Sequence, residues 1–465
     1  MFLNLKMVSY DAYIGVLPQS SLARIISESY TTPLGQLLIG TVVKKKCPET
    51  EVVIFDPVRT SPEQIYQNIS AIRWQHDRIL LGLTLLTGNS RAGFEMAGYC
   101  SELGVEVIIG GQDVAGYGTM EIMRDRPWIE YGTDGPGEII VPALVAGTAP
   151  EDIAGLTYRD HNNLQQNKKS TTRLDWLNVQ VDYSLLDNIT GNSGATYLLG
   201  NDCAFANKRC YFCGRQPLGN PQTETEIELR VERVWKEIEQ ARSLGITYYF
   251  NSADSALVNF KLFSAFAEAK PDWFNPEFHH LFANAHEITL QAIPLLQKLG
   301  ATVYMGVENT QLNNYGKGRN SFQTDSLPAI ELLHQNNVPM RLSFVFGSTG
   351  ESEHTLESNL MTITQLVRKY PGITDLELNP LQVLPGTRAY QDLMSEKKDN
   401  YTALAKPYDP IEMSRDIIPL ISGLSRDKVL EWIKRMYQEI KAVTPGIRVN
   451  TKGISQEEFS FLSAA

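Results

Sequence analysis

Short apolar runs alternate with amphipathic segments through the first 150 residues, and this alternation predicts strands followed by helices. The predicted strands cover residues 3–10, 52–55, 79–83, 105–109 and 129–132. The predicted helices cover residues 32–46, 61–75, 90–103, 117–124 and 137–146. Strands that are apolar throughout are typical of a sheet covered by helices on both faces. The pattern therefore predicts an α/β domain at 1–150 with a parallel, doubly wound, Rossmann-like sheet.

The segment at 151–190 is more polar and predicts a linker. It contains the run from Gln165 to Ser170 and the sequence Asp160-His161-Asn162-Asn163. Clusters of such residues between periodic segments are typical of surface turns. We interpret His161 as a solvated loop residue.

A second alternation extends from residue 191 to residue 395. Its predicted strands cover 195–200, 246–250, 278–282, 302–305, 339–346 and 376–384. Its predicted helices cover 227–241, 256–269, 288–298, 324–336 and 355–369, and the helix after the last strand is short or irregular. These six strand–helix units predict a parallel barrel or an open parallel sheet, and they are too few for a closed eight-stranded barrel.

The last segment, 396–465, predicts a small helical domain with helices near 411–422 and 426–442. We expect it to close the open side of the barrel.

The clearest helical pattern is the one that begins at Ile227. Its apolar residues recur three and four positions apart, at Ile227, Val231, Val234, Ile238 and Ala241. This spacing places them on one face of a helix. The charged residues assigned to the opposite face are Glu226, Arg230, Glu237 and Glu239.

Composition excludes some classes of protein. The formal net charge is −11 and no stripe of Lys or Arg stands out, so we do not expect sequence-independent binding to nucleic acid. No apolar run reaches the roughly 18 residues that would indicate a membrane span. The N-terminus shows no export signal. Free thiols without secretion indicate a reducing cytoplasm.

Three of the five cysteines, Cys203, Cys210 and Cys213, fall within eleven positions after the strand predicted at 195–200. Three thiolates that converge on one point suit an iron–sulfur cluster with one open iron, or a zinc site that lacks one ligand. Buried structural cysteines are the plainer interpretation. The clustering favours a metal site, and no other Cys or His close in sequence supplies a fourth ligand.

The segment Cys210-Tyr211-Phe212-Cys213-Gly214, preceded by Cys203, resembles the signature loop of the radical S-adenosylmethionine (radical SAM) enzymes. The family usually has three residues between the first two cysteines, and this chain has six. The resemblance implies that Cys203, Cys210 and Cys213 are catalytic and hold a [4Fe–4S] cluster, with SAM at the open iron. The six strand–helix units match the partial (β/α)6 TIM barrel of this family.

The chemistry of such barrels gathers at the carboxyl ends of the strands, where this sequence places small and polar residues. Gly306-Val307-Glu308 resembles the family segment that handles the ribose and methionyl end of SAM. The run from Gly347 to Glu351 resembles the Gly-x-Pro-Gly-Glu turn beside the adenine, and Asn251 to Asp254 takes the place of the segment that meets the amino group. The SAM contacts implied by the resemblance are Phe212, Gly214, Asn251, Asp254, Glu308 and Gly347.

Plainer interpretations exist for some of these residues. Asp254 and Glu308 each precede a helical pattern, so either could be a helix cap. His286, at the end of another strand, is equally compatible with a surface position and with one that faces the substrate.

The first domain resembles the cobalamin-binding domain that precedes many radical SAM cores. The resemblance is carried by Pro33-Leu34-Gly35, Ile109-Gly110-Gly111 and the run from Tyr131 to Glu138. The motif Asp-x-His-x-x-Gly is absent, so no His from that motif would ligate cobalt. Glycines at strand ends are also common in simple turns. The implied cobalamin contacts are Thr84, Gly110, Gly111, Gln112, Gly132, Thr133, Asp134 and Gly135.

These resemblances imply a cobalamin-dependent radical SAM methyltransferase that methylates an unactivated carbon of a natural-product or peptide substrate. An electron donor such as flavodoxin or ferredoxin would supply the electron. A second hypothesis is a radical SAM enzyme that catalyses a rearrangement, oxidation, epimerisation or cyclisation without methylation. A third is a zinc-stabilised nucleotide-binding or regulatory protein with no radical step.

Overall fold

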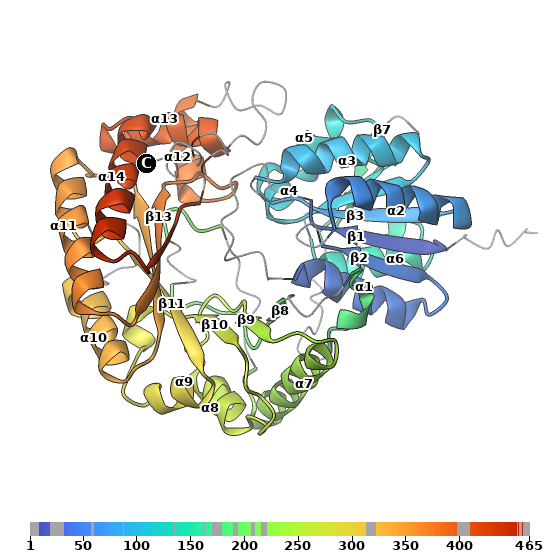
Figure 1. Cartoon of the computed structure of the whole chain (residues 1–465). Helices are drawn as coiled ribbons and strands as arrows, with labels where there is room; N and C mark the ends of the chain where they lie inside the picture. The colour runs from blue at the N-terminus through green and yellow to red at the C-terminus, as the bar shows by residue number, and fades with distance from the viewer. Residues whose placement is uncertain are drawn as a thin grey trace, which may run out of the picture.

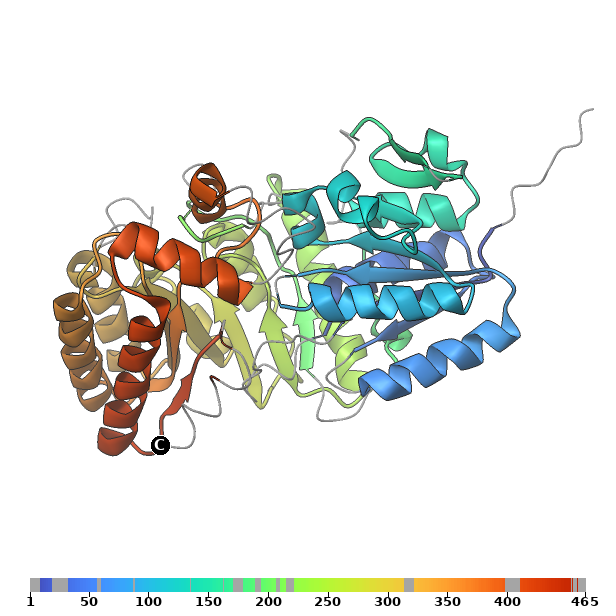
Figure 2. The same ribbon diagram turned by 90° about the horizontal axis from the view of Figure 1, so that it is seen from above.

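The computed structural model places two mainly parallel sheets side by side, each in its own lobe (Figure 1, Figure 2). The described residues are 9–18, 32–56, 60–86, 88–133, 135–161, 163–169, 179–188, 194–205, 210–214, 221–312, 322–397, 410–452, 454 and 458.

The first lobe is built on a sheet with the strand order β2-β1-β3-β4-β5-β6-β7. Its strands are β1 (Ala12–Val16), β2 (Glu51–Phe55), β3 (Ile79–Thr84), β4 (Glu106–Gly110), β5 (Tyr131–Thr133), β6 (Leu156–Asp160) and β7 (Asn163–Gln166). Strands β1 to β5 are parallel, whereas β6 and β7 are antiparallel to their neighbours. The order 2-1-3-4-5 has its topological switch point between β1 and β3, where ligands of such sheets bind beyond the carboxyl ends.

Helices cover both faces of this sheet because its strands are apolar on both sides. They are α1 (Leu34–Lys46), α2 (Pro62–Gln75), α3 (Ser90–Glu102), α4 (Gln112–Tyr117), α5 (Thr119–Arg124) and α6 (Gly137–Val145). Leu80 of β3 belongs to the same buried cluster as Leu37 of α1 and Ile140 of α6. The next residue, Leu81, belongs to the opposite cluster with Ile65 of α2. This alternation is the two-residue period of a strand, and it confirms the doubly wound sheet.

The second lobe contains a parallel sheet with the order β14-β13-β12-β11-β10-β9-β8. Its strands are β8 (Gly194–Tyr197), β9 (Tyr248–Asn251), β10 (Phe278–Phe282), β11 (Ala301–Glu308), β12 (Met340–Phe346), β13 (Ile373–Pro380) and β14 (Arg448–Asn450). Its helices are α7 (Glu224–Ser243), α8 (Phe260–Glu268), α9 (Ile293–Lys298), α10 (Leu327–Gln335), α11 (Glu353–Lys369), α12 (Arg388–Lys397), α13 (Pro410–Ser422) and α14 (Arg426–Val443). In the part of the chain that the structure describes, β8 and β14 are the two edges, so the sheet is open.

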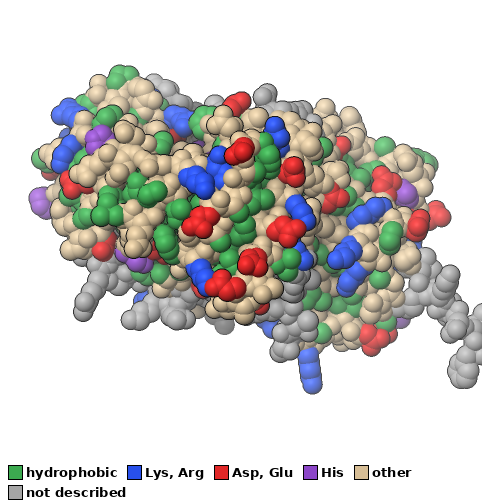
Figure 3. Space-filling model, turned by 90° about the horizontal axis from the view of Figure 1, so that it is seen from below, with side chains coloured by type: hydrophobic (Ala, Val, Ile, Leu, Met, Phe, Trp, Pro, Cys, Tyr) green, Lys and Arg blue, Asp and Glu red, His purple; other side chains and the backbone are tan. Residues whose placement is uncertain are grey.

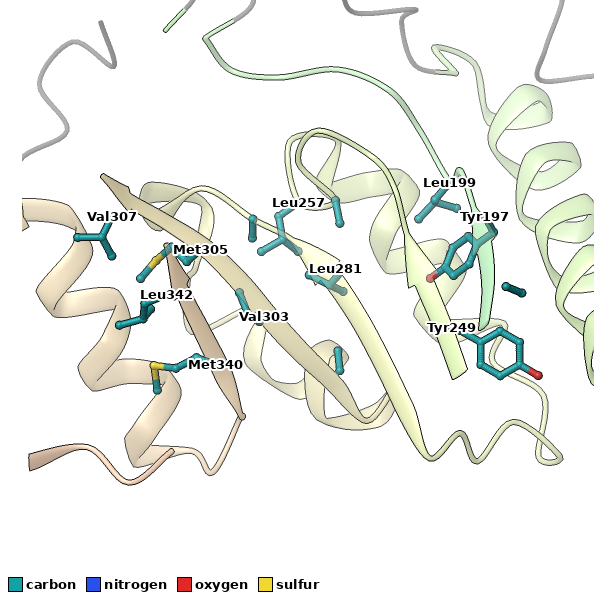
Figure 4. Close-up of a cluster of buried hydrophobic side chains, with 14 of the residues drawn as sticks. Tyr197, Leu199, Tyr249, Leu257, Leu281, Val303, Met305, Val307, Met340 and Leu342 are labelled. Carbon is teal, nitrogen blue, oxygen red and sulfur yellow. The ribbon is translucent and has the colours of Figure 1, made fainter. Parts of the chain in front are cut away.

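The helices from α7 to α11, with α14, form an arc on the outer side of this sheet (Figure 1). The strand residues that face them are apolar at alternate positions, such as Val303, Met305 and Val307 of β11 (Figure 4). These side chains join Leu281 of β10 and Leu342 of β12 in one buried cluster. The same cluster includes Leu37 and Ile140 of the first lobe, so one continuous core supports both sheets.

Three parts of the two sheets differ from the sequence expectations. The first strand is Ala12–Val16 instead of residues 3–10, and residues 1–8 lie outside the described part of the chain. The segment expected to be a linker contains the hairpin β6–β7, which extends the first sheet past residue 150. The C-terminal segment supplies β14 in addition to helices, because Arg448 pairs with Asp375 of β13. The strands β6, β7 and β14 are short and rich in polar residues, so they lack the apolar runs on which the expectations depended.

The charged face assigned to α7 was partly wrong. Glu226 and Glu239 are exposed, but Arg230 and Glu237 are buried. Arg230 donates to the carbonyl oxygens of Leu198 and Leu199, just after β8, and lies 3.8 Å from the Glu237 carboxylate. Glu237 also accepts a hydrogen bond of 3.0 Å from the Val181 backbone N–H. The helix thus carries a buried ion pair that holds the chain where β8 ends.

The surface matches the mixed composition of the chain. The face shown in Figure 3 carries Lys and Arg interspersed with Asp and Glu. Among the helices that the structure describes, none is both long and apolar enough to cross a membrane.

We predict that Glu237→Ala lowers the free energy of unfolding by roughly 3–5 kcal/mol, because it leaves the Arg230 guanidinium buried without its carboxylate. Urea unfolding followed by circular dichroism measures this. Glu239→Ala on the exposed face of the same helix is the control, with a change expected to be under about 0.5 kcal/mol. Similar losses for both variants would contradict the buried ion pair.

Candidate active site

The loops at the carboxyl ends of the first sheet contact those of the second. The Gln112 side-chain amide at the start of α4 lies directly over Gly214, where a Cβ atom would overlap it. Gly116 of α4 lies so close to Pro385 that an added Cβ would be 2.7 Å from the Pro385 carbonyl carbon. Tyr117 meets Tyr390 of α12 edge to face, with ring centroids 5.4 Å apart. The two carboxyl edges therefore border one common region.

The cysteine loop leaves β8 at this region and is anchored on α12. The Cys213 N–H donates to the Cys210 carbonyl at 3.0 Å, which closes a tight turn. The Tyr211 hydroxyl donates to Asp392 at 3.0 Å, and the Ala389 N–H donates to the Tyr211 carbonyl at 3.1 Å. Burial and the Asp392 carboxylate raise the pKa of Tyr211, so its hydroxyl remains a donor. The second half of the loop is thus held at both its backbone and its side chain.

The three candidate ligands lie on this one loop but are not gathered around a single point. Cys210 is buried, while Cys203 and Cys213 are partly exposed, and none of the three forms a disulfide. Within the described ranges, no group of three or more His, Cys, Asp or Glu side chains is arranged to hold a metal ion. The donor set itself, three cysteines on one loop, has the chemistry of an iron–sulfur ligand set with one open iron.

Cys203 lies beside the ends of β9 and β10. Its backbone N–H donates to Asp202 Oδ1 at 2.8 Å. Burial, together with the Asp254 and Glu287 carboxylates, raises the pKa of the Cys203 thiol. His286 is 40% exposed at its side chain, and its ring meets Phe205 edge to face at 5.4 Å. His286 therefore lies at the rim of the site.

Asn251, at the end of β9, is fully buried and connects this strand to the start of the cysteine loop. Its Oδ1 accepts hydrogen bonds from the N–H groups of Leu199 and Ala253, at 3.3 and 3.2 Å. Its Nδ2 atom is buried without a hydrogen-bond partner. The Nε2 atom of Gln112 is likewise buried without a hydrogen-bond partner. Buried amide donors without acceptors are rare in folded proteins, so both atoms are suited to a ligand acceptor.

Glu308, at the end of β11, has a strained backbone. Its φ is +65°, and the Asn309 N–H donates to the Val307 carbonyl at 2.8 Å, so Glu308 is the centre of a positive-φ γ-turn. The pairing with β12 shifts register between Gly306 and Glu308. Such turns are rare, and strain of this kind clusters at active sites. The strain favours the functional interpretation of Glu308 over that of a helix cap.

The turn after β12 is built around the buried carboxylate of Glu351. That carboxylate accepts hydrogen bonds from the backbone N–H groups of Gly347 and Ser348, and from Asn309 Nδ2 at 2.9 Å. Desolvation outweighs these donors and raises the pKa of Glu351 to about 7. Gly347 has φ +97°, which a residue with a side chain adopts only with strain. Glu351 therefore joins the ends of β11 and β12.

The residues expected to contact cobalamin lie along the carboxyl edge of the first sheet. Thr84 ends β3 and accepts a hydrogen bond of 2.8 Å from Gln36. The Thr133 hydroxyl accepts one of 3.0 Å from the Gly135 N–H, which shapes the turn after β5. The neighbours on the same edge are Gly110, Gly111, Gln112 and Gly132, at the ends of β4 and β5. Asp134 lies outside the described residues.

Sequence reasoning missed Glu287, which lies in the turn beside Cys203, and Asp392, which accepts a hydrogen bond from Tyr211 of the cysteine loop. For Glu287 a signal was present, since Asn284 followed three residues later by Glu287 is the spacing of a capping box. For Asp392 there was none, because its partner Tyr211 is 181 positions away.

No protein-family model matches the sequence, and no curated protein matches it either. Solved structures do. The radical S-adenosylmethionine methyltransferase TsrM from Kitasatospora setae, with cobalamin and a [4Fe–4S] cluster bound, has a TM-score of 0.64 at 15% identity, over 83% of this chain and 78% of that one. TsrM with tryptophan substrate and a SAM analogue has a TM-score of 0.63 at 16% identity, over 83% and 76%.

OxsB, a cobalamin-dependent SAM radical enzyme, is a second such structure. With aqua-cobalamin and SAM bound, it has a TM-score of 0.62 at 14% identity, over 92% of this chain and 66% of OxsB. This chain therefore has the fold of TsrM and OxsB, and the expected α/β class is confirmed, with two sheets that are mainly parallel and a helical C-terminal part.

We predict that Glu351→Gln flattens the pH dependence of stability between about pH 4.5 and 7. The raised pKa of Glu351 means that its contribution is present below the unfolded-state pKa and is lost as pH rises through about 7. For a carboxyl group this buried, the loss is on the order of 2 kcal/mol. Urea unfolding of the wild type and of Glu351→Gln at pH 5 and pH 8 isolates the contribution of this carboxyl group. An equal loss of stability in both proteins between the two pH values would contradict the raised pKa of Glu351.

We also predict that Gly116→Ala loosens the contact between the lobes, because its methyl group would overlap the Pro385 backbone. Gly98→Ala in α3 is the matched control, since its Cβ would be 3.8 Å from the nearest atom of Trp128. In a helix with space available, that change is expected to add about 0.5–1 kcal/mol of stability. Thermal unfolding and limited proteolysis distinguish the two, and equal stability of both variants would count against the close contact.

Proposed function

We propose that this protein is a cobalamin-dependent radical SAM methyltransferase that methylates an unactivated carbon of a natural-product or peptide substrate. The observation that carries the proposal is the placement of Cys203, Cys210 and Cys213 on a loop at the carboxyl edge of an open parallel sheet, in contact with the carboxyl edge of a doubly wound sheet. The fold likeness supports it, because TsrM and OxsB structures of this fold hold cobalamin.

Each part of the site has a task in this proposal. The three thiolates would hold a [4Fe–4S] cluster, and the edge from Thr84 to Gly135 would hold cobalamin. When bound, the cluster supplies the one electron that cleaves the sulfonium of SAM, and cobalamin supplies the methyl group. A flavodoxin or ferredoxin is the proposed source of that electron.

The residues of the second sheet would bind and orient SAM. Asn251 Nδ2 is a buried donor without an acceptor, which suits a carboxylate of the ligand. The γ-turn fixes the backbone of Glu308 at the end of β11. Gly347 lies in the turn whose backbone N–H groups donate to Glu351. The remaining proposed SAM contacts are Phe212 and Gly214 of the cysteine loop, and Asp254 after β9. A site that holds the sulfonium close to the cluster without competing water would favour the electron transfer.

We predict that replacing any one of Cys203, Cys210 and Cys213 with Ala abolishes the cluster and the cleavage of SAM. After anaerobic reconstitution, the wild type should hold roughly four irons per chain, as a [4Fe–4S] cluster requires. Iron analysis, EPR spectra and the yield of 5′-deoxyadenosine are the measurements. Cys47→Ala is the matched control, because Cys47 is a partly exposed thiol of the first lobe. A variant of the loop that still cleaves SAM would refute the assignment.

The product of SAM distinguishes methylation from the alternative, a rearrangement, oxidation, epimerisation or cyclisation. Methyl transfer produces S-adenosylhomocysteine, and the purified protein should then carry about one corrinoid per chain. Turnover that yields 5′-deoxyadenosine without S-adenosylhomocysteine would favour the non-methylating alternative. One zinc per chain with no iron would reject both.

A further inference from the structure

A groove with a volume of about 510 Å³ lies between α7 and α8, on the outer side of the second sheet (Figure 1). Its lining residues come from these two helices and from the segment between α8 and β10. None of them belongs to the cysteine loop or to the end of a strand. The groove is therefore separate from the candidate active site.

The floor of the groove is aromatic and held in place by its own contacts. Trp235 of α7 stacks on Phe266 of α8, with ring centroids 4.3 Å apart and an angle of 7° between the ring planes. The indole N–H of Trp235 donates to the Phe266 carbonyl at 3.2 Å. Trp273 meets Trp235 edge to face at 6.1 Å and is partly exposed. The two indoles thus form a fixed apolar corner that is accessible from outside.

Glutamates border this corner along α7. Glu228, Glu232 and Glu239 are exposed and line the groove. Together with Trp235 they recur four, three and four positions apart, a spacing that places them on one face of the helix. Lys236 also lines the groove and pairs with Glu232 at 2.5 Å, which offsets one of the carboxylates. Three glutamates and one lysine give the lining a net charge of −2.

Two of these carboxylates are available to an external cation. In the part of the chain that the structure describes, neither Glu228 nor Glu239 forms an ion pair. Aromatic rings also attract cations over their faces. Trp273 already does so within this chain, because the Arg242 guanidinium carbon lies 5.2 Å from its ring centroid, although Arg242 does not line the groove.

The surface around the groove agrees with this description. The underside of the molecule in Figure 1, where α7 and α8 lie, faces the viewer in Figure 3. Apolar side chains are exposed in the middle of that face, with acidic side chains beside them. An occupant that carries an apolar side chain between positive charges is complementary to both the floor and the rim of the groove.

We propose that this groove docks a basic segment of a polypeptide partner, in which lysine or arginine side chains flank an apolar one. The exposed rim leaves the groove open, so it would cover too little of a small ligand to bind it tightly. A polypeptide segment is long enough, because Glu228 and Glu239 are separated by about 16 Å along the helix, the length of roughly five extended residues. The inference goes beyond the proposed function and does not depend on it.

The experiment uses a fluorescein-labelled peptide, Lys-Ser-Leu-Ser-Lys-Ser-Leu-Ser-Lys, whose lysines and leucines share one face when it is extended. It is titrated into the full-length protein at low salt, and fluorescence polarisation measures the affinity. The double variant Glu228→Gln with Glu239→Gln should bind the peptide about threefold to tenfold more weakly, as expected for the loss of two exposed ion pairs. Ala269→Arg, which places a cation at an exposed position of the groove, should weaken binding by a similar factor.

The matched control is the double variant Glu102→Gln with Glu357→Gln. These residues are exposed on α3 and α11, outside the groove, and their replacement changes the net charge of the chain by the same amount. We expect this control to bind the peptide within about twofold of the wild type, since separate surface charges are screened by salt. A peptide with glutamate in place of each lysine should not bind.

Weaker binding by the groove variants alone, with further weakening as salt is added, supports the inference. Equal losses for the groove and control variants would show attraction by the overall charge of −11 and overturn it. Absence of binding to the wild type also overturns it. Sedimentation velocity tests a different occupant, because a dimer that Ala269→Arg dissociates would assign the groove to a second copy of this chain and reject the basic segment. Iron content and SAM cleavage test the proposed function separately, whatever the peptide does.

Discussion

The contact between α4 and the segment before α12 is the constraint on which the rest of the arrangement depends. Gly116 packs against Pro385 without room for a side chain, and Gln112 covers Gly214. One buried cluster runs from Leu37 of the first lobe to the core of the second sheet, so the two lobes are supported by a common interior. Because of this packing, the carboxyl edges of two separate sheets face one region.

Much of the fold could be predicted from the sequence because its strands are apolar and its helices amphipathic. The six strands from β8 to β13 and the helices between them follow the expected order, with ends that differ by a few residues. The hairpin β6–β7 and strand β14 could not be predicted in this way. Their residues are polar, and pairing with an existing sheet edge stabilises them more than any local preference does.

For the candidate site, too, the sequence predicts some residues and not others. Residues at strand ends could be found from sequence, because polar and small residues interrupt apolar runs there. Their partners could not, because a tertiary contact decides whether a charged residue on a helix is exposed. Arg230 and Glu239 both lie on α7 and both looked like surface residues. Only Arg230 donates to the carbonyl oxygens of Leu198 and Leu199. Those hydrogen bonds offset the free-energy cost of burying its charge.

The two halves of the cysteine loop are supported in different ways, and the difference has a chemical consequence. The half that contains Cys210 and Cys213 is anchored on α12 through hydrogen bonds of the Tyr211 hydroxyl and carbonyl group. The half that contains Cys203 lies beside the turn after β10, where burial and the Asp254 and Glu287 carboxylates raise the pKa of the Cys203 thiol. The carboxylates disfavour a free thiolate at Cys203, whereas a bound cation would reverse that preference. The charge state of Cys203 therefore depends on what the loop holds.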